Sequence, residues 1–257
     1  MTTTPKLRVA LLADLRRHEE VDPLRAARLE ERIRAEGIQV NPMVCVEADG
    51  MLVVLDGATR TEALRGLGLE HAVVQVVDPG EVDLGTWHHV VRQCAPTELL
   101  ERIQEDPNLA LEADRGPPRV RLASGEVRTV SGKGITPNAT LTSLVAVYIG
   151  RWPVARVTDA DAVVAGSVFE DWGAVIELPT LSVEDVMRAA VGDDPLPAGV
   201  TRFLIPDRAL RLNFDLSILE EEASTEDKQR RLDELIEQRS REGRVRRYEE
   251  TVFIYDD

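Results

Sequence analysis

The stretch 51–77, MLVVLDGATRTEALRGLGLEHAVVQVV, constrains the fold of this chain more than any other. Residues 51–55 form an uninterrupted apolar run with β-branched members, which predicts a buried strand. Asp56-Gly57 then predicts a tight turn, because glycine adopts turn conformations without steric cost. The apolar residues that follow recur at helical spacing, so the chain is expected to pass from a strand directly into a helix.

The predicted helix has a start signal and an end signal. Thr59 and Glu62 have the spacing of a capping box, in which a hydroxyl and a carboxylate each bind a free amide at the helix start. Gly66 and Gly68 predict its end. Residues 72–77 are a second apolar run and predict another buried strand. The local order is therefore strand, glycine turn, helix, strand.

A turn of this kind can bind an anion. The amides of Gly57 and Ala58 would point outward at a helix N-terminus, where the helix dipole favours negative charge. The planar guanidinium of Arg60 matches phosphate oxygens. The same spacing also fits an ordinary capped helix with Arg60 in solvent. Because strand–glycine–helix turns are common and this one is not a P-loop, spacing alone favours the ordinary helix.

The residues before this stretch predict a compact mixed unit. Residues 7–12 predict a first strand, and a charged loop leads to Asp22 and Pro23, which suit the cap and first position of a helix. Residues 43–46 predict a strand that forms a hairpin with the strand over 51–55. The element order is then β–α–β–β–α–β.

The DGATR sequence at 56–60, followed by an Ala-Leu helix, resembles the DG-x-x-R box of the ParB/sulfiredoxin-like fold. It is most similar to the free serine kinase branch of that fold. One departure is Thr59, since those kinases usually carry His before the Arg. The resemblance implies an α+β (mixed α/β) protein. We expect a ParB/sulfiredoxin-like nucleotide-binding domain over 1–95 and a second α/β domain over 96–257 that closes over the substrate site.

A His-Glu pair lies in the loop before the first long helix, as it does in the kinase branch, where the Glu is the proposed catalytic base. The match gives that role to Glu19 and leaves Glu20 as an alternative. A serine hydroxyl must lose its proton as it attacks a phosphoryl group, and a positioned carboxylate can accept that proton. Without the resemblance, a solvated acidic loop beside Arg16 and Arg17 would be the better interpretation.

A second block, Gly-Val-Thr-Arg at 199–202, also resembles the serine kinases. There the Thr helps to hold serine, so the match assigns Thr201 and Arg202 to the serine site. Many relatives place His next, where this chain has Phe203. Three arginines between 202 and 211 form a local basic cluster, although exposed arginines that balance nearby carboxylates would explain two of them equally well.

Trp87-His88-His89 is the third candidate. In the kinases a Trp in this region lines the amino-acid site, which suggests that Trp87 contacts serine, and His88 is a weaker candidate for a phosphate contact. A core Trp with two exposed His residues is an equally good interpretation. Adjacent histidines cannot both face one ion from a regular element, so we assign no residue as a metal ligand.

The net charge of −15 argues against a general nucleic-acid binder, because phosphate contacts need a basic face. Cys45 and Cys94 are far apart and lack metal-ligand spacing, which favours a reduced, cytoplasmic chain. No apolar run approaches the roughly 20 residues that a membrane span needs. Farther along, apolar residues over 162–168 predict a strand, 220–240 a charged helix, and 244–248 and 251–255 two short strands.

The resemblance as a whole implies a kinase that converts free L-serine to O-phospho-L-serine with ADP or ATP and Mg²⁺, as a monomer or homodimer. Its phosphate cradle would be Gly57, Ala58, Thr59 and Arg60, with Asp56 orienting metal or water. The alternative is a ParB-like nucleotide-binding transcriptional regulator without kinase activity, although no helix-turn-helix is evident. Sulfiredoxin chemistry would need a Cys in the box, where this chain has Ala58 and Thr59.

Overall fold

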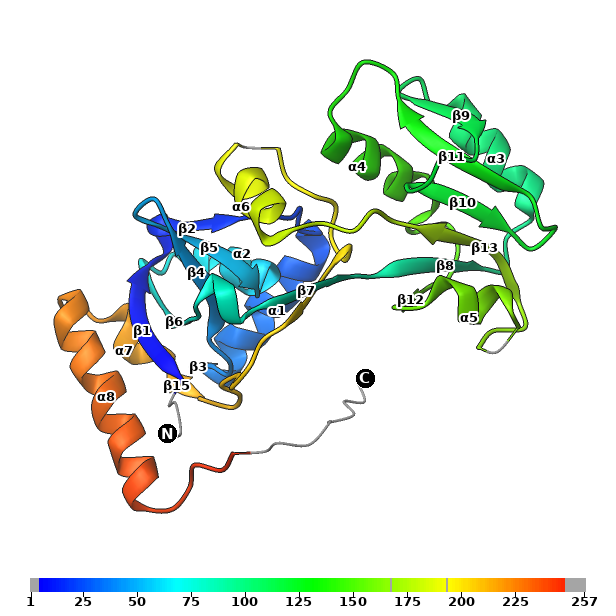
Figure 1. The fold of residues 1–257 in the computed structure, drawn as a ribbon. Coiled ribbons are helices and arrows are strands. Elements are labelled where there is room, and N and C mark those ends of the chain that lie inside the picture. Colours follow the sequence, from blue (N-terminus) through cyan, green and yellow to red (C-terminus); the bar gives the residue numbers. More distant parts are fainter. Residues whose placement is uncertain (1–4, 167, 193, 248–257) are drawn as a thin grey trace.

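The computed structural model describes residues 5–166, 168–192 and 194–247. Within them lie two main sheets, each covered by helices, with α6 (Val183–Val191) between the two bodies (Figure 1). The predicted α+β class is confirmed. The predicted strand over 251–255 and residue 248 lie outside the described residues, and 244–247 form no strand.

The first sheet contains, among the described residues, five strands in the order β1-β6-β4-β5-β2. Their bounds are β1 (Lys6–Leu11), β6 (His71–Val76), β4 (Met43–Ala48), β5 (Met51–Asp56) and β2 (Leu15–Arg17). β1 and β6 are antiparallel, as are β4 and β5, whereas β4–β6 and β2–β5 are parallel. The charged segment of β2, expected to be a loop, is instead a short edge strand beside β5.

Helices α1 (Pro23–Glu36) and α2 (Ala58–Gly66) pack against each other beside this sheet. The period-two alternation along β5 explains why its apolar run is continuous. Leu52 and Val54 join a cluster with Leu64 of α2, whereas Val53 and Leu55 join a second cluster that includes Val200. Both faces of β5 are therefore buried, and its packing fixes the position of residues 56–60 at its end.

The second sheet is antiparallel, with the order β12-β8-β13-β10-β11-β9. Its strands are β12 (Val154–Val157), β8 (His88–Arg92), β13 (Trp172–Glu177), β10 (Arg119–Leu122), β11 (Val127–Gly132) and β9 (Leu109–Ala113). Helices α3 (Pro96–Glu105) and α4 (Pro137–Tyr148) share a core with one face, and α5 (Ala160–Val164) packs on the other. The apolar run over 162–168, expected to be a strand, overlaps this short helix, because a brief apolar run does not distinguish the two.

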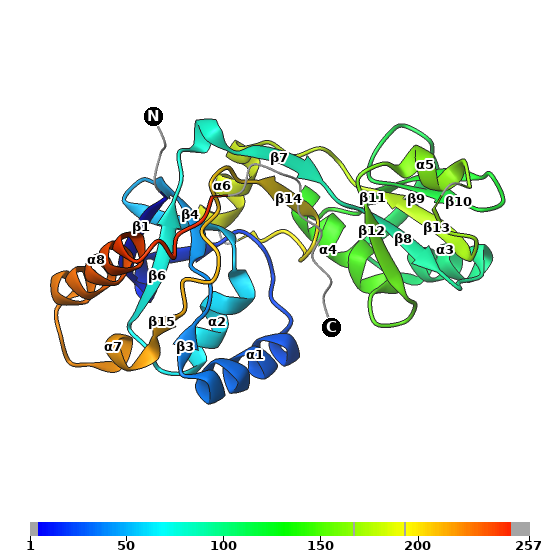
Figure 2. The same cartoon turned by 90° about the horizontal axis from the view of Figure 1, so that it is seen from below.

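Short two-stranded sheets join distant parts of the chain. β7 (Asp83–Thr86) pairs with β14 (Thr201–Leu204), and together they run between the two bodies (Figure 2). β3 (Ile38–Gln39) pairs with β15 (Phe214–Asp215). Two 3-10 turns, η1 (Leu12–Asp14) and η2 (Pro79–Glu81), complete the connections.

The C-terminal segment returns to the first sheet. α7 (Leu216–Glu220) precedes α8 (Thr225–Arg241), which packs along β1, and Leu232 of α8 belongs to the first-sheet core. The expected division into 1–95 and 96–257 therefore differs from the division of the sheets. β8 lies in the second sheet, while α7 and α8 lie on the first, because their apolar faces complete its core. The helix expected over 220–240 is confirmed as α8, which begins later, at Thr225, while Glu220 is the last residue of α7.

Candidate functional site

The predicted phosphate cradle is a turn held by its own backbone. Gly57 has a φ of +105° and is the N-cap of α2, with no side-chain cap on the helix. A Cβ there would meet Met43 and the Arg60 guanidinium, so glycine is required. The predicted capping box at Thr59 is wrong, because this left-handed turn lets the helix begin at Ala58. Glu62 instead accepts from Arg65 and forms an ion pair with Arg17.

Arg60 is partly engaged by the protein. Its Nη1 donates to the Pro42 carbonyl at 3.0 Å, which holds the guanidinium beside the turn. Burial lowers the pKa of Arg60, and the Asp56 carboxylate opposes that shift. The positive charges of Arg208 and Arg32 lower the same pKa further, so both of these guanidinium groups lie near that of Arg60. An excess of positive charge at an uncapped helix N-terminus suits a bound anion.

His18 is the residue that joins the three predicted blocks. Its ring is fully buried between the first sheet and β14. Nδ1 lies 2.7 Å from the Val54 carbonyl, and Nε2 lies 3.1 Å from Thr201 Oγ1. Because a carbonyl only accepts, Nδ1 carries the hydrogen and Nε2 accepts from the Thr201 hydroxyl. Burial lowers the pKa of His18, while Glu19 and Asp56 raise it, which places both carboxylates near the ring.

Glu19 and Glu20 differ in their surroundings. The Glu19 carboxylate is half-buried, and its Oε2 accepts from the Gly199 amide at 3.3 Å. Glu20 is exposed. The backbone on either side is fixed, because Leu196 donates to His18 O and accepts from the Glu20 amide, each at 2.8 Å. The loop over 194–200 thereby holds the predicted base from the side of the second sheet.

The predicted serine-site residues lie together where β7 meets β14. The Trp87 amide donates to the Val200 carbonyl at 2.8 Å, and Thr86 is directly opposite Thr201. The Arg202 guanidinium lies over the Trp87 ring, 5.1 Å from its centroid. Trp87, Thr201 and Arg202 are therefore neighbours although more than a hundred residues separate them in the sequence.

His88 and His89 lie in β8 and belong to the second sheet. His88 Nδ1 accepts from the Leu178 amide at 3.2 Å, and burial lowers the pKa of its ring. His89 is buried, with Nδ1 2.8 Å from the Tyr148 hydroxyl and Nε2 3.0 Å from the Gly199 carbonyl. The interpretation of these residues as two exposed histidines is wrong. Among the described residues, His88 makes its hydrogen bond to Leu178 and none to the turn at Gly57.

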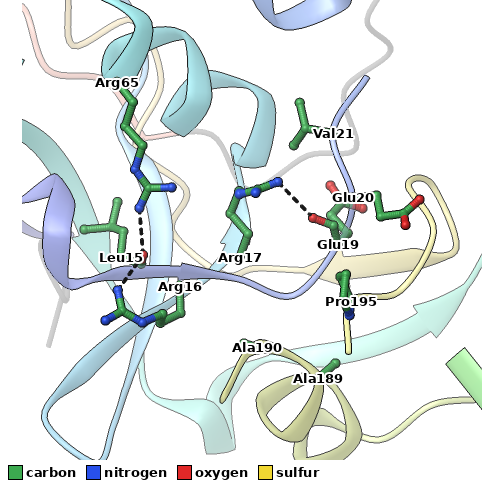
Figure 3. Close-up of a pocket in the computed structure, with 10 residues that line it drawn as sticks. All are labelled: Leu15, Arg16, Arg17, Glu19, Glu20, Val21, Arg65, Ala189, Ala190 and Pro195. Atoms are coloured by element: carbon green, nitrogen blue, oxygen red, sulfur yellow. Dashed lines mark hydrogen bonds between the residues drawn. The ribbon is translucent and has the colours of Figure 1, made fainter. Parts of the chain in front are cut away.

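A pocket of about 510 Å³ opens beside the predicted base (Figure 3). It contains both predicted catalytic carboxylates, three arginines, and small residues of α6 and the following loop, namely Leu15, Arg16, Arg17, Glu19, Glu20, Val21, Arg65, Ala189, Ala190 and Pro195. Figure 3 shows Glu19 and Glu20 close together, with Arg17 directed toward Glu19 and Arg65 toward Leu15. None of the predicted phosphate or serine residues lines this pocket; of the predicted site residues, Glu19 and Glu20 do.

Sequence reasoning did not assign roles to three residues that complete the site. His18 was part of a matched motif, but its bonds to Val54 and Thr201 depend on a fold that brings distant segments together. Arg208 Nη1 donates to Asp56 Oδ2 at 2.7 Å. The only sequence signal for Arg208 was its membership of a local basic cluster. Gly199 begins the matched Gly-Val-Thr-Arg block, but its hydrogen bond to Glu19 depends on the fold.

Other chemistry is limited in the part of the chain that the structure describes. There, no three His, Cys, Asp or Glu side chains form a group that could hold a metal ion. Both cysteines are free and buried, and burial raises the pKa of the Cys45 thiol to about 12. None of the described helices has the length and apolar character of a membrane span.

Comparisons with known proteins agree with the resemblance seen in the sequence. No family model matches the chain. A solved free serine kinase in complex with AMP has a TM-score of 0.74 and 16% identity, and the match covers 85% of this chain and 95% of that one. The predicted resemblance to free serine kinases is confirmed, and the chain has their fold.

A particular relative is SbnI of Staphylococcus aureus (strain NCTC 8325 / PS 47), an ATP-dependent L-serine kinase. It is 24% identical over 213 residues, which are 81% of this chain and 82% of SbnI. The structure of SbnI with a C-terminal truncation has a TM-score of 0.75 and 22% identity, with 91% of this chain and 97% of that chain covered.

Proposed function

We propose that this protein is a kinase that transfers a phosphoryl group from ADP or ATP to the hydroxyl of free L-serine. The observation that carries the proposal is the buried ring of His18, whose two nitrogens reach the strand before the phosphate turn and the Thr201 hydroxyl. The residue next to it is Glu19. Two separately matched segments thus contact each other, and one of them also contacts the strand that leads into the third. Relatives that match this chain over most of their length are named as serine kinases, which supports the proposal.

In the proposed reaction, the L-serine hydroxyl oxygen forms a bond to the terminal phosphorus of the nucleotide. The bond between that phosphorus and the bridging oxygen of the nucleotide breaks. Glu19 accepts the hydroxyl proton and passes it to solvent after turnover. O-Phospho-L-serine leaves together with AMP when ADP is the donor, or with ADP when ATP is the donor. Phosphoryl transfer depends mainly on positioning and charge neutralisation, which a half-buried carboxylate and a cationic turn can supply.

The donor phosphates would lie at the N-terminus of α2. Its first amides have no side-chain cap, and Gly57 lets an anion approach closely. Arg60 would add a charge-assisted hydrogen bond beyond the one it makes to Pro42. The acceptor would lie between Trp87, Thr201 and Arg202. Since the Thr201 hydrogen is used in its bond to His18, the hydroxyl oxygen remains as an acceptor for the serine ammonium.

Mg²⁺ is part of the proposal. Such ions are usually held by one or two carboxylates plus substrate phosphates and waters, which does not require a preformed protein cage. Asp56 fits that role, because Arg208 engages Oδ2 and leaves Oδ1 available. When bound, the ion would neutralise phosphate charge, while Asp56 orients it or its water.

An assay with purified protein tests the proposal. L-Serine is supplied with ADP or with ATP, each with and without Mg²⁺, and phosphoserine and the nucleotide product are measured together. We expect phosphoserine to appear in a one-to-one ratio with AMP or ADP. Nucleotide hydrolysis without phosphoserine, or binding of nucleotide with no product from either donor, would support a nucleotide-binding regulator instead.

A further inference from the structure

The peptide of Gly199 lies between the proposed base and the core of the second sheet. Its N–H donates to Glu19 Oε2 at 3.3 Å, and its carbonyl lies 3.0 Å from His89 Nε2. Gly199 has a φ of +81°, and the Arg156 guanidinium occupies the space that a Cβ would take. One glycine residue, in a conformation that favours glycine, therefore connects a carboxylate on the charged loop with a ring on β8.

Hydrogen-bond chemistry fixes the direction of this chain. The Gly199 carbonyl only accepts, so His89 Nε2 carries the hydrogen, and Nδ1 accepts from the Tyr148 hydroxyl at 2.8 Å. Both side chains are buried, and their rings meet edge to face with centroids 5.8 Å apart. Tyr148 donates to His89, His89 to Gly199, and Gly199 to Glu19. Because the C=O and N–H of Gly199 belong to the peptide groups on either side of its Cα, the His89 bond acts on the Glu19 bond by fixing the backbone conformation of Gly199.

Burial makes the arrangement independent of pH near neutrality. It lowers the pKa of His89 to about 4, so the ring stays neutral and keeps one tautomer. Burial also raises the pKa of Tyr148, which keeps its hydroxyl protonated as a donor. Each member of the chain thus remains in the protonation state that the geometry requires.

We propose that His89 and Tyr148 are positioning residues that fix the backbone conformation of Gly199 and thereby orient the Glu19 carboxylate. The inference rests on the proposed function, in which Glu19 is the base. In the part of the chain that the structure describes, the Gly199 amide is the one hydrogen-bond donor to that carboxylate. The backbone bonds between Leu196 and residues 18–20 fix the loop but leave the Glu19 side chain free to rotate.

A purely structural histidine would behave differently. If His89 only joined β8 to the loop over 194–200, its removal would lower stability and leave the turnover of the folded enzyme unchanged. If it orients the base, its removal lowers kcat with little change in KM, because His89 is assigned no contact with either substrate. Misplacement of a catalytic group by about 1 Å costs about 100-fold in rate.

The experiment compares full-length His89→Leu, His89→Gln and Tyr148→Phe with the parent, using steady-state kinetics and the folded fraction from circular dichroism. We expect His89→Leu to lower kcat by about 10- to 100-fold. His89→Gln keeps an N–H donor for the Gly199 carbonyl and should restore most of the activity, and Tyr148→Phe should cause a smaller loss. The matched control is His71→Gln, another buried histidine, whose ring binds Thr225 and Lys228. This control should leave kcat unchanged.

Glu19→Gln in the same assay distinguishes failure of the proposed function from failure of the positioning role. If Glu19→Gln is as active as the parent, the base assignment fails and the positioning role fails with it. If Glu19→Gln is inactive while folded His89→Leu keeps the parental kcat, the kinase proposal stands and the positioning role is overturned. Should His89→Leu fail to fold, Tyr148→Phe decides, since it removes a single hydroxyl: a parental kcat in that variant would overturn the inference.

Discussion

Arg208 donates to Asp56 at 2.7 Å, so a residue near the C-terminal end holds the acid of the turn that opens α2. The pair holds the guanidinium of Arg208 near that of Arg60. The positive charge of Arg208 lowers the pKa of Arg60. The segment that carries Arg208 is itself fixed, because Gln75 binds the Asp207 carbonyl and the Ala209 amide. The turn therefore depends on chain that follows the second sheet.

Arg208→Ala should weaken nucleotide binding while leaving stability nearly unchanged. The pair is about one-third exposed, with side-chain exposures of 32% and 42%, and such pairs contribute about 0–1 kcal/mol to folding. Calorimetric titration with ADP and with ATP measures the affinity, and thermal unfolding measures the stability. Arg230→Ala, which removes an exposed pair with Asp227 on α8, is the matched control. Equal nucleotide affinities in the two variants would show that Arg208 has no part in the phosphate site.

Arg60→Ala should weaken nucleotide binding more than serine binding. Loss of a charge-assisted hydrogen bond to phosphate should cost roughly 1.5–3 kcal/mol, with some loss of stability because Arg60 also holds the Pro42 carbonyl. Separate titrations with nucleotide and with L-serine test this, with Arg34→Ala on exposed α1 as the control. An unchanged nucleotide affinity would count against the phosphate cradle.

Much of the fold could be predicted because local patterns and final structure agree. The strand–turn–helix–strand order over 51–77 is confirmed as β5, α2 and β6, and Asp22 caps α1 through the amides of Leu24 and Arg25. Predictions failed where tertiary context decided. The Gly57 turn overrode the capping pattern at Thr59, and pairing with β5 turned a charged segment into β2.

The candidate site was predictable only through its matched motifs. Glu19, the box and Thr201 carry recognisable residues, whereas the contacts that assemble them span 36 residues from His18 to Val54 and 183 to Thr201. Local sequence patterns do not predict contacts between residues so far apart in the sequence. The contact of Arg208 with Asp56 also joins residues far apart in the sequence, so no role could be predicted for Arg208. For the same reason the sequence allowed an exposed His89, although its ring contacts Tyr148 and Gly199.

Stability should fall on acidification, in part through His89. Its folded pKa of about 4 lies below the ordinary 6.5, so protonation favours the unfolded chain. The contribution of the neutral ring is complete above pH 6.5 and is lost as the pH falls toward 4. By linkage, the loss at about pH 4.5 is about 2–3 kcal/mol.

His18 and His71 shift in the same direction, so the parent must be compared with His89→Gln to isolate this effect. Urea unfolding of both proteins at neutral and at acidic pH gives the difference. The parent should lose more stability than the variant on acidification, and equal losses would contradict the prediction.

The protein should not retain duplex DNA at physiological salt. Its net charge of −15 repels a polyanion, and the arginines near the box converge on one turn rather than forming a stripe. A gel-shift titration with random-sequence and genomic fragments tests this. Salt-sensitive retention at sub-micromolar protein would favour the ParB-like regulator.

The central claim is that Glu19 is the base of a serine kinase, and the most direct measurement compares phosphoserine formation by Glu19→Gln and Glu20→Gln. Loss of a general base costs about 10²–10⁴-fold in rate, so Glu19→Gln should lose that much while calorimetry shows nucleotide still binding. Glu20→Gln, at an exposed position, should remain close to the parent. An inactive Glu20→Gln beside an active Glu19→Gln would move the role by one residue. Parental turnover in both variants would contradict the account.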